Sequence, residues 1–414
     1  MFLHQSLSTP VMNAVAAAEG AYVIDTEGRR YLDFHGNGVH NAGFNHRKVL
    51  DAVRRQLDSG MTFCPRRYTN EPAVAAAKKL VSIAPQGMTR VLFCPGGSEA
   101  NEMALMLARQ VTGNFKSISY WESFHGAGFM TASVGGDIHF RGGAGPLMPG
   151  ALHVEYPDYY RNPWGFEEPE RVDGECLRQM ELLFHNEAPI SAVIGEPVFA
   201  TPRVPTKAYW EGVRDLCDRH GAFLIFDEVI EGLGRTGKML CSEHFATPDV
   251  ITLGKSLGGG LVPWAGIITH EKYNTVRHRS IGHFTHEKNA LCCAAALAEI
   301  EAIEEEGMVE NAATLGDYVL DRLREMQDRH PLIGHVAGLG LHFGIDLVKD
   351  RETKERAKQE AEAVMYECLE RGLSFKTIEG NILTLRPALC ITKEELDQAL
   401  EILEESIEEV ESRL

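Results

Sequence analysis

Lys255 stands in a setting that suits a reactive amine. It follows the apolar run 250–253 and is followed closely by Gly258, Gly259 and Gly260. Lysine is rarely buried, and removal from water lowers the pKa of its amine, so that the amine can act as a nucleophile and carry protons. The alternative is a lysine whose amine reaches solvent from the strand end. The dense glycines permit close approach of a ligand or of another backbone segment.

Two other apolar runs end in carboxylates. Asp227 and Glu228 follow the run 223–226, and Glu196 follows the run 192–194 and precedes a proline. A carboxylate after a buried strand is costly without a partner, and the protonated ring nitrogen of a cofactor is one such partner. The alternatives are an acidic pair that caps a helix or bridges to an arginine, and a turn residue before proline.

A glycine-rich turn follows the apolar run 91–93. Gly96, Gly97 and Ser98 lie between this run and a helical pattern. Free backbone N–H groups at the positive end of a helix favour a bound phosphate, to which the Ser98 hydroxyl would add a donor. An ordinary turn with a serine that caps the helix is the alternative.

The elements that must position these residues alternate along the chain. Short apolar runs alternate with helical segments from about residue 90 to residue 268, which predicts an α/β domain with a mostly parallel sheet. Ligands of such sheets bind outside the carboxyl ends of the strands, where Ser98, Glu196, Asp227 and Lys255 all stand. The predicted strands are 91–93, 118–120, 192–194, 223–226, 250–253 and 265–268.

Flanking segments complete the expected architecture. The N-terminal stretch 20–34 reads as two short strands around a turn, and residues 134–164, rich in glycine and proline, are predicted to form a long loop. Helices are predicted at 47–58, at 70–84, from about 289 through 303, and at 393–414, with strand-like segments at 335–336, 341–345 and 382–385.

Composition restricts the class of partner and the compartment. The chain of 414 residues has a formal net charge of -18 at pH 7, which disfavours nucleic acid and anionic membrane as partners. No apolar run is long enough for a membrane span, and residues 1–10 lack the pattern of a leader peptide. The nine cysteines include no CxxC pair, so we expect no metal site and a cytoplasmic location.

Five segments in order resemble the motifs of the class III aminotransferases, the family of ornithine and 4-aminobutyrate aminotransferases. The resemblance covers nearly the whole chain, and five ordered motifs are far more specific than one. They are the opening 20–33, the phosphate loop 97–102, the aromatic-His-Gly step 124–126, the acidic signature 227–237 and the lysine signature 248–260.

The resemblance implies an enzyme that uses pyridoxal 5'-phosphate (PLP) and has fold type I. That fold is α/β, with a large domain on a mostly parallel seven-stranded sheet and a smaller α+β domain built from both ends of the chain. The implied parts are residues 1–45 and 286–414 for the small domain and residues 46–285 for the large PLP-binding domain.

The resemblance also assigns roles to residues. Lys255 would bind PLP as an aldimine and carry the proton, and Asp227 would pair with the pyridinium nitrogen. Phe124 would stack on the ring, and Glu196 would line the substrate side or gate a substrate-binding arginine. The two residues that would hold the phosphate are Gly97 and Ser98.

Thr285 resembles the family residue that reaches the phosphate bound by the neighbouring subunit. The active unit would then be a homodimer with shared active sites. The run that contains Thr285 lacks the glycines that follow the threonine in the family, and Ile230 stands where the family has glutamine.

The arginine near the C-terminus looks displaced. Thr384 stands at the position of the family's usual arginine, and Arg386 lies two residues later on the same strand face. Arg386 is therefore either a replacement anchor for a substrate carboxylate or a surface charge.

Two further features favour a phosphorylated or phosphonate substrate. Arg66 and Arg67 are adjacent, and paired arginines suit a dianion. The segment 37–40, which ends at His40, resembles one near the entrance of the phosphoethanolamine phospho-lyase branch of the family. The alternatives are an exposed basic turn and a loop histidine.

Three functional hypotheses follow. The leading one is a transaminase that moves the amino group of a small amine or amino acid to an oxo acid. The second is a PLP-dependent lyase on a small amino-phosphonate or amino-phosphate, such as a 1-hydroxy-2-aminoethylphosphonate. The third is a non-catalytic PLP-binding module, which the intact Lys255 and the lack of a basic helix-turn-helix pattern disfavour.

Overall fold

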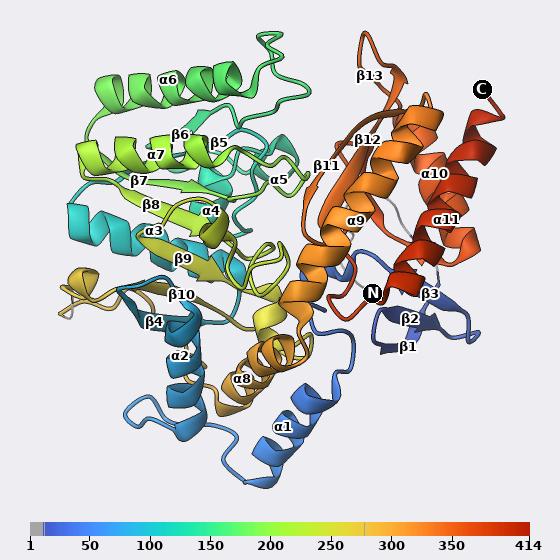
Figure 1. Ribbon diagram of the computed structural model, residues 1–414. Coiled ribbons are helices and arrows are strands. Elements are labelled where there is room, and N and C mark those ends of the chain that lie inside the picture. The colour runs from blue at the N-terminus through green and yellow to red at the C-terminus, as the bar shows by residue number, and fades with distance from the viewer. Residues whose placement is uncertain (1–10, 12, 277) are drawn as a thin grey trace.

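A sheet of seven strands forms the centre of the larger part of the molecule (Figure 1). The computed structural model describes residue 11, residues 13–276 and residues 278–414. The strand order is β4-β10-β9-β8-β7-β5-β6; strands β9 to β6 run parallel, and β10 runs antiparallel to both neighbours. The predicted fold class is confirmed. The strands are β4 (Met88–Cys94), β5 (Lys116–Tyr120), β6 (Ala151–Val154), β7 (Ile190–Gly195), β8 (Phe223–Asp227), β9 (Val250–Leu253) and β10 (Ala265–His270).

Both faces of this sheet are covered by helices, which explains why its central strands read as unbroken apolar runs. Successive side chains of β8 point to opposite faces: Leu224 and Phe226 pack with α6 (Pro169–Glu187) and α7 (Lys207–His220), whereas Phe223 and Ile225 pack with α3 (Gly97–Thr112). In Figure 1, α6 and α7 lie above the sheet, whereas α3 is drawn at the level of β8 and β9.

A second helical layer lies beneath the large sheet. The helix α8 (Ala290–Glu305) packs against α1 (Arg47–Asp58) and α2 (Glu71–Ile83), and the predicted helices at 47–58 and 70–84 are thereby confirmed. The short helices are α4 (Phe129–Val134), α5 (Ile138–Arg141), η1 (Gly36–Gly38), η2 (Cys241–His244), η3 (Lys255–Gly258) and η4 (Glu271–Tyr273).

The remaining elements come from the two ends of the chain and lie side by side in Figure 1. One sheet has the order β1-β2-β3-β14, in which Leu32 pairs with Leu373 in the parallel β3–β14 contact. The other has the order β11-β12-β16-β15, with β13 on β12. The strands are β1 (Val15–Glu19), β2 (Tyr22–Asp25), β3 (Arg30–Asp33), β11 (Ile333–Leu339), β12 (His342–Asp350), β13 (Glu355–Arg356), β14 (Leu373–Ser374), β15 (Lys376–Ile378) and β16 (Ile382–Leu385), and the helices are α9 (Met308–Arg329), α10 (Lys358–Arg371) and α11 (Lys393–Glu411).

The segment 134–164 differs from the predicted loop. It contains α5 and the strand β6, which extends the large sheet beyond β5. The strand was missed because it has only four residues and follows a run of glycines and prolines that signal turns.

Two sequence expectations concern targeting. Residues 1–10, on which the leader-peptide prediction falls, lie outside the described residues. Within the described part of the chain, no helix combines the length and the apolar character that a bilayer-spanning segment needs. The domain boundaries at 45 and 285 stay predictions.

Candidate active site

Lys255 lies at the turn where β9 passes into η3. Its φ of 47° is a left-handed conformation, which costs a residue with a side chain about 1–3 kcal/mol and is typical of functional sites. A Cβ on Gly38 would lie 3.2 Å from Lys255 Cδ, so the turn at η1 closes over the lysine stem. Burial lowers the pKa of Lys255, and the nearby Asp227 and Glu231 oppose this shift. Such an amine can act as a nucleophile and as a proton carrier.

Asp227 ends β8 and is held by side chains from three other segments. Its Oδ2 accepts a hydrogen bond from Asn101 Nδ2 at 2.6 Å and lies 2.8 Å from His125 Nδ1. Its Oδ1 accepts from Thr252 Oγ1 at 3.3 Å and from the backbone N–H of Val229 at 3.2 Å. The carboxylate is buried and its orientation is therefore fixed.

The N-terminus of α3 forms a cradle beside this carboxylate. Gly96 precedes the helix and has no side chain to cap it. Ser98 Oγ accepts a hydrogen bond from the backbone N–H of Ala127 at 3.0 Å. A Cβ on Gly126 would lie 2.5 Å from Ser98 Oγ, and a Cβ on Gly97 would lie 3.0 Å from the Val229 side chain. The glycines therefore keep the helix end open to an anion.

These features fit PLP. A cavity of about 340 Å³ opens beside Lys255 and the helix end at Pro95 and Gly96. A lysine with a lowered pKa, an uncapped helix N-terminus and a buried, oriented carboxylate are the groups that bind the aldehyde, the phosphate and the ring nitrogen of this cofactor. Phe124, the predicted stacking residue, is 42% exposed and packs against Phe140 with ring centroids 4.4 Å apart.

Two buried carboxyl groups in the same interior region have oxygens without hydrogen-bond partners among the described residues. Glu196 follows β7 and Glu231 follows β8; they are 4% and 0% exposed. Among the described residues, no partner is found for Glu196 Oε1 or for either carboxyl oxygen of Glu231. Burial raises the pKa of Glu196 to about 7. Burial raises the pKa of Glu231 well above its ordinary value, and the nearby Glu196 raises it further.

Arg386 follows β16 and faces these carboxyl groups. It is 4% exposed, which excludes the interpretation as a surface charge. Its Nη2 donates to the backbone carbonyl of Ala200, and its Nε has no partner in the described structure. His342 Nε2 lies 3.3 Å from the same carbonyl, and His342 Nδ1 lies 3.7 Å from Glu231 Oε1.

Lys376 adds a third cation to this region. Burial, with the positive charges of Arg386 and Lys255, lowers its pKa to about 8. Among the residues that the structure describes, Lys376 forms no ion pair with a carboxylate. A lysine without a carboxylate partner beside two other cations favours a bound anion.

Arg66, Arg67 and Thr285 are exposed in the single chain. Arg66 Nε pairs with Glu287 at 2.9 Å, and its Nη2 donates to Ser280 Oγ at 3.3 Å. The loop that carries the two arginines therefore packs on the segment before α8. Their roles in substrate or cofactor binding stay predictions.

His40 is buried close to the turn that covers Lys255. Its ring stacks on Phe44 with centroids 4.8 Å apart, and its Nε2 lies 3.3 Å from the backbone carbonyl of Asp33. Its Nδ1 has no partner among the described residues. Burial lowers the pKa of His40 to about 3, so the ring is neutral at physiological pH. A contact between His40 and substrate also stays a prediction.

Several groups of this region were not predicted as site residues. Asn101 and His125 lie inside recognised motifs, but only the fold brings them to Asp227. Glu231 lies in a turn, where a glutamate is unremarkable until its burial is known. Lys376 begins a three-residue strand that carries no motif.

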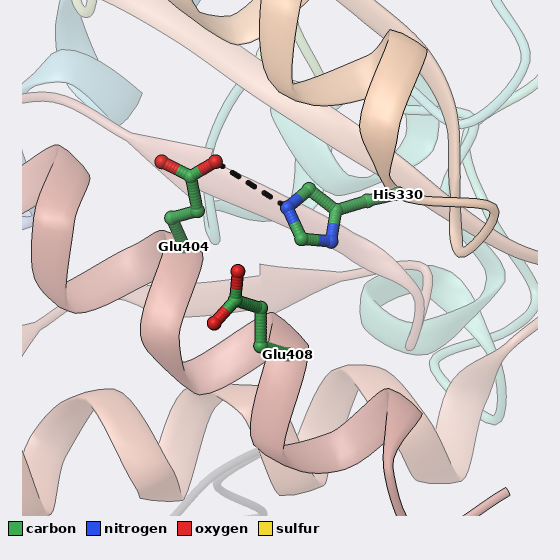
Figure 2. A group of neighbouring side chains, drawn as sticks. All are labelled: His330, Glu404 and Glu408. Atoms are coloured by element: carbon green, nitrogen blue, oxygen red, sulfur yellow. Dashed lines mark hydrogen bonds and ion pairs between the residues drawn. The ribbon is translucent and has the colours of Figure 1, made fainter.

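A second cluster of polar side chains lies far along the chain, between the end of α9 and α11. Figure 2 shows His330 with Glu404 and Glu408, whose potential ligand atoms all lie within 4.8 Å of one another. His330 Nδ1 already pairs with Glu411 at 2.8 Å, and Arg329 pairs with Glu404. These contacts make the cluster an ion-pair network that holds α11 against α9.

The comparisons with known proteins decide the family. The model of the class-III aminotransferases matches residues 4–407. The chain belongs to the class-III aminotransferase family. It is an enzyme with PLP as its cofactor, so the hypothesis of a non-catalytic module is wrong.

Members of this class-III family with different activities resemble the chain over nearly its whole length. It is 44% identical to the (R)-1-hydroxy-2-aminoethylphosphonate ammonia-lyase of Vibrio splendidus, over 99% of this chain and 88% of that one. It is 39% identical to the leucine/methionine racemase of Thermococcus litoralis, with coverages of 95% and 90%. Among solved structures, a PLP-bound amine transaminase from an uncultivated Pseudomonas species gives a TM-score of 0.94 at 30% identity, with coverages of 99% and 98%.

Proposed function

We propose that this enzyme is an ammonia-lyase for a small hydroxylated aminophosphonate of the (R)-1-hydroxy-2-aminoethylphosphonate type. The observation that carries the proposal is the pair Arg386 and Lys376 near Lys255, because a buried arginine and a half-buried lysine without an ion-pair partner suit a doubly charged anion. The 44% identity to the Vibrio splendidus ammonia-lyase supports the same class of substrate.

Different residues would bind the cofactor and the substrate. Bound PLP supplies an electron sink for the carbon next to the substrate amine. Asp227 would hold the ring nitrogen, and the end of α3 at Gly97 and Ser98 would hold the phosphate. Lys255, freed by the substrate amine, would take the proton from the carbon that bears this amine.

Arg386 and Lys376 would orient the substrate from its other end. A phosphonate between them offers oxygens to both cations, which removes their mutual repulsion and fixes the carbon chain relative to Lys255. The exposed Arg66 and Arg67 would then act before this step, by attracting the dianion toward the entrance.

Transamination is the second candidate. The transaminase fold matches with a TM-score of 0.94, and the same lysine and carboxylate serve both reactions. Transamination leaves the amino group on the cofactor and needs an oxo acid to remove it, whereas elimination releases ammonia at each turnover.

This difference gives the test. The PLP-loaded protein is mixed with (R)-1-hydroxy-2-aminoethylphosphonate, with and without pyruvate or 2-oxoglutarate, while ammonia and the cofactor spectrum are followed. We expect ammonia release that needs no oxo acid, and its loss in Lys255→Ala by about 10²- to 10⁴-fold or more. A conversion to the pyridoxamine form that only an oxo acid reverses would overturn the lyase proposal in favour of transamination.

A further inference from the structure

Glu231 is a buried acid that the binding of cofactor and of a phosphonate does not require. It is 0% exposed, and neither of its carboxyl oxygens has a hydrogen-bond partner among the described residues. A buried carboxyl group normally accepts hydrogen bonds, as the neighbouring Glu228 does. Its oxygens accept from the backbone N–H groups of Cys241 at 2.6 Å and Ser242 at 2.9 Å. An unsatisfied buried carboxyl group costs free energy and points to a function.

Glu231 is linked to Arg386 through His342, because His342 Nδ1 approaches Glu231 while His342 Nε2 and Arg386 Nη2 both contact the backbone carbonyl of Ala200. The charge of Glu231 acts on Lys255 and Arg386, and the charges of Asp227 and Glu196 act on it in turn. His342 Nδ1 lies 3.7 Å from Glu231 Oε1, and burial and nearby arginines lower the pKa of His342 well below its ordinary value. A neutral imidazole does not neutralise a carboxylate, so Glu231 is best accommodated in its acid form.

A dianionic substrate strengthens this preference. Asp227, Glu196 and Glu231 already share the region with the cations Lys255 and Arg386. Adding a phosphonate adds negative charge, so a carboxyl group without hydrogen-bond donors would be the last to ionise. Glu231 would therefore carry a proton while substrate is bound.

We propose that Glu231 is the catalytic acid that protonates the departing hydroxyl group of the substrate. This inference rests on the lyase proposed above. After Lys255 takes the proton from the carbon that bears the amine, the bond between the neighbouring carbon and its hydroxyl oxygen breaks. The oxygen keeps the electron pair of that bond, takes the proton of the Glu231 carboxyl group and leaves as water.

The overall reaction balances without an oxidant or reductant. The eliminated product carries a carbon–carbon double bond beside the amine; hydrolysis adds one water back and gives an aldehyde phosphonate and ammonia. The water lost and the water added cancel, the proton taken by Lys255 returns to carbon, and Glu231 recovers its proton from solvent.

Glu231→Gln tests this role because the amide has the same shape and cannot give a proton. Two substrates are compared, (R)-1-hydroxy-2-aminoethylphosphonate and its analogue with chlorine in place of the hydroxyl group. Chloride leaves without a proton. We expect Glu231→Gln to slow ammonia release from the hydroxyl substrate by about 100-fold or more and to change chloride release by less than about 3-fold.

Two further measurements distinguish a catalytic role of Glu231 from a purely structural one. Infrared difference spectra at pH 7 should show a protonated carboxyl band in the wild-type protein that is lost in Glu231→Gln. The affinity for 2-aminoethylphosphonate, which has no leaving group, should change little. Glu299→Gln is the matched control, since Glu299 is also a buried glutamate but lies behind η3 and accepts a hydrogen bond from the backbone N–H of Ala42.

The possible failures are distinct. Equal slowing of both substrates, unchanged release from the hydroxyl substrate, or no carboxyl band would overturn the role of Glu231 and leave the lyase in place. A wild-type protein that releases ammonia from neither substrate would overturn the proposed function, and the inference with it.

Discussion

At the scale of single residues, the site combines fixed and unsatisfied groups. Three hydrogen-bond donors and a nitrogen of the His125 ring hold the carboxylate of Asp227. The carboxyl group of Glu231 has no hydrogen-bond partner among the described residues. The first arrangement suits a group that must keep one position relative to a cofactor. The second suits a group whose partner arrives with the substrate.

Lys376→Ala and Arg386→Gln test the anion site. Each removes a cation from the proposed phosphonate site, and a hydrogen bond to a charged group contributes about 1.5–3 kcal/mol. We expect the KM for the phosphonate to rise about 10- to 100-fold in each variant. Steady-state kinetics measure this, with Lys272→Ala as a control that removes an exposed lysine.

The same experiment separates the two sets of basic residues. Arg66→Ala and Arg67→Ala should change the association rate at low salt more than the final affinity, because both side chains are exposed. Unaltered KM in Lys376→Ala together with a large rise in Arg67→Ala would move the anion site to the loop.

At the scale of elements, the cofactor cradle depends on how closely the loop after β5 approaches α3. A Cβ on Gly126 would lie 2.5 Å from Ser98 Oγ and 2.7 Å from Ser98 Cα, so the loop or the helix end must move to accommodate it.

Gly126→Ala is therefore expected to weaken PLP binding by about 10-fold or more, because the displaced helix end no longer presents its N–H groups to the phosphate. Equilibrium dialysis with PLP measures the effect. Gly174→Ala is the control, since Gly174 lies in α6 with nothing within 4 Å of the added Cβ, and alanine there should stabilise the helix by about 0.5–1 kcal/mol. Unchanged PLP affinity in Gly126→Ala would contradict the cradle.

The elements also show what sequence can predict. The strands β7, β8 and β9 were predicted because burial on both faces leaves an unbroken apolar run, and α1 occupies the range 47–58 that was predicted for a helix. The strand β6 was missed because a short edge strand carries little such signal. Motifs located Lys255 and Asp227, but the burial of Glu231 and the approach of Lys376 to Arg386 arise only from tertiary packing.

At the scale of the whole molecule, buried acids make stability depend on pH. Burial raises the pKa of Glu299 to about 8, from an ordinary value of 4.5. Between these values the folded protein keeps a proton that the unfolded chain has released, so the free energy of unfolding falls as pH rises through this window. The half-buried His35 and the buried His40, whose pKa values are lowered to about 3, act in the opposite sense only below their ordinary value of 6.5.

Glu299→Gln should flatten this dependence. The amide oxygen can still accept from the N–H of Ala42, which lies at 3.1 Å, but it has no proton to lose. We expect the loss of unfolding free energy between pH 6.5 and pH 8 to be smaller in the variant by about 1–2 kcal/mol. Urea unfolding of both proteins at the two pH values measures it. Parallel pH dependences would show that Glu299 is not protonated in the folded protein.

The pairing of Leu32 with Leu373 has a consequence for the order in which the chain is made. The strand β3 leaves the ribosome early, and its parallel neighbour β14 follows only after most of the chain has been synthesised, on the order of tens of seconds later. During that interval the edge of β3 has open backbone donors and acceptors, which other nascent chains could pair with. The strand β3 is thus translated early but gains its second neighbour late. We expect a chaperone that shields strand edges to raise the yield of native enzyme.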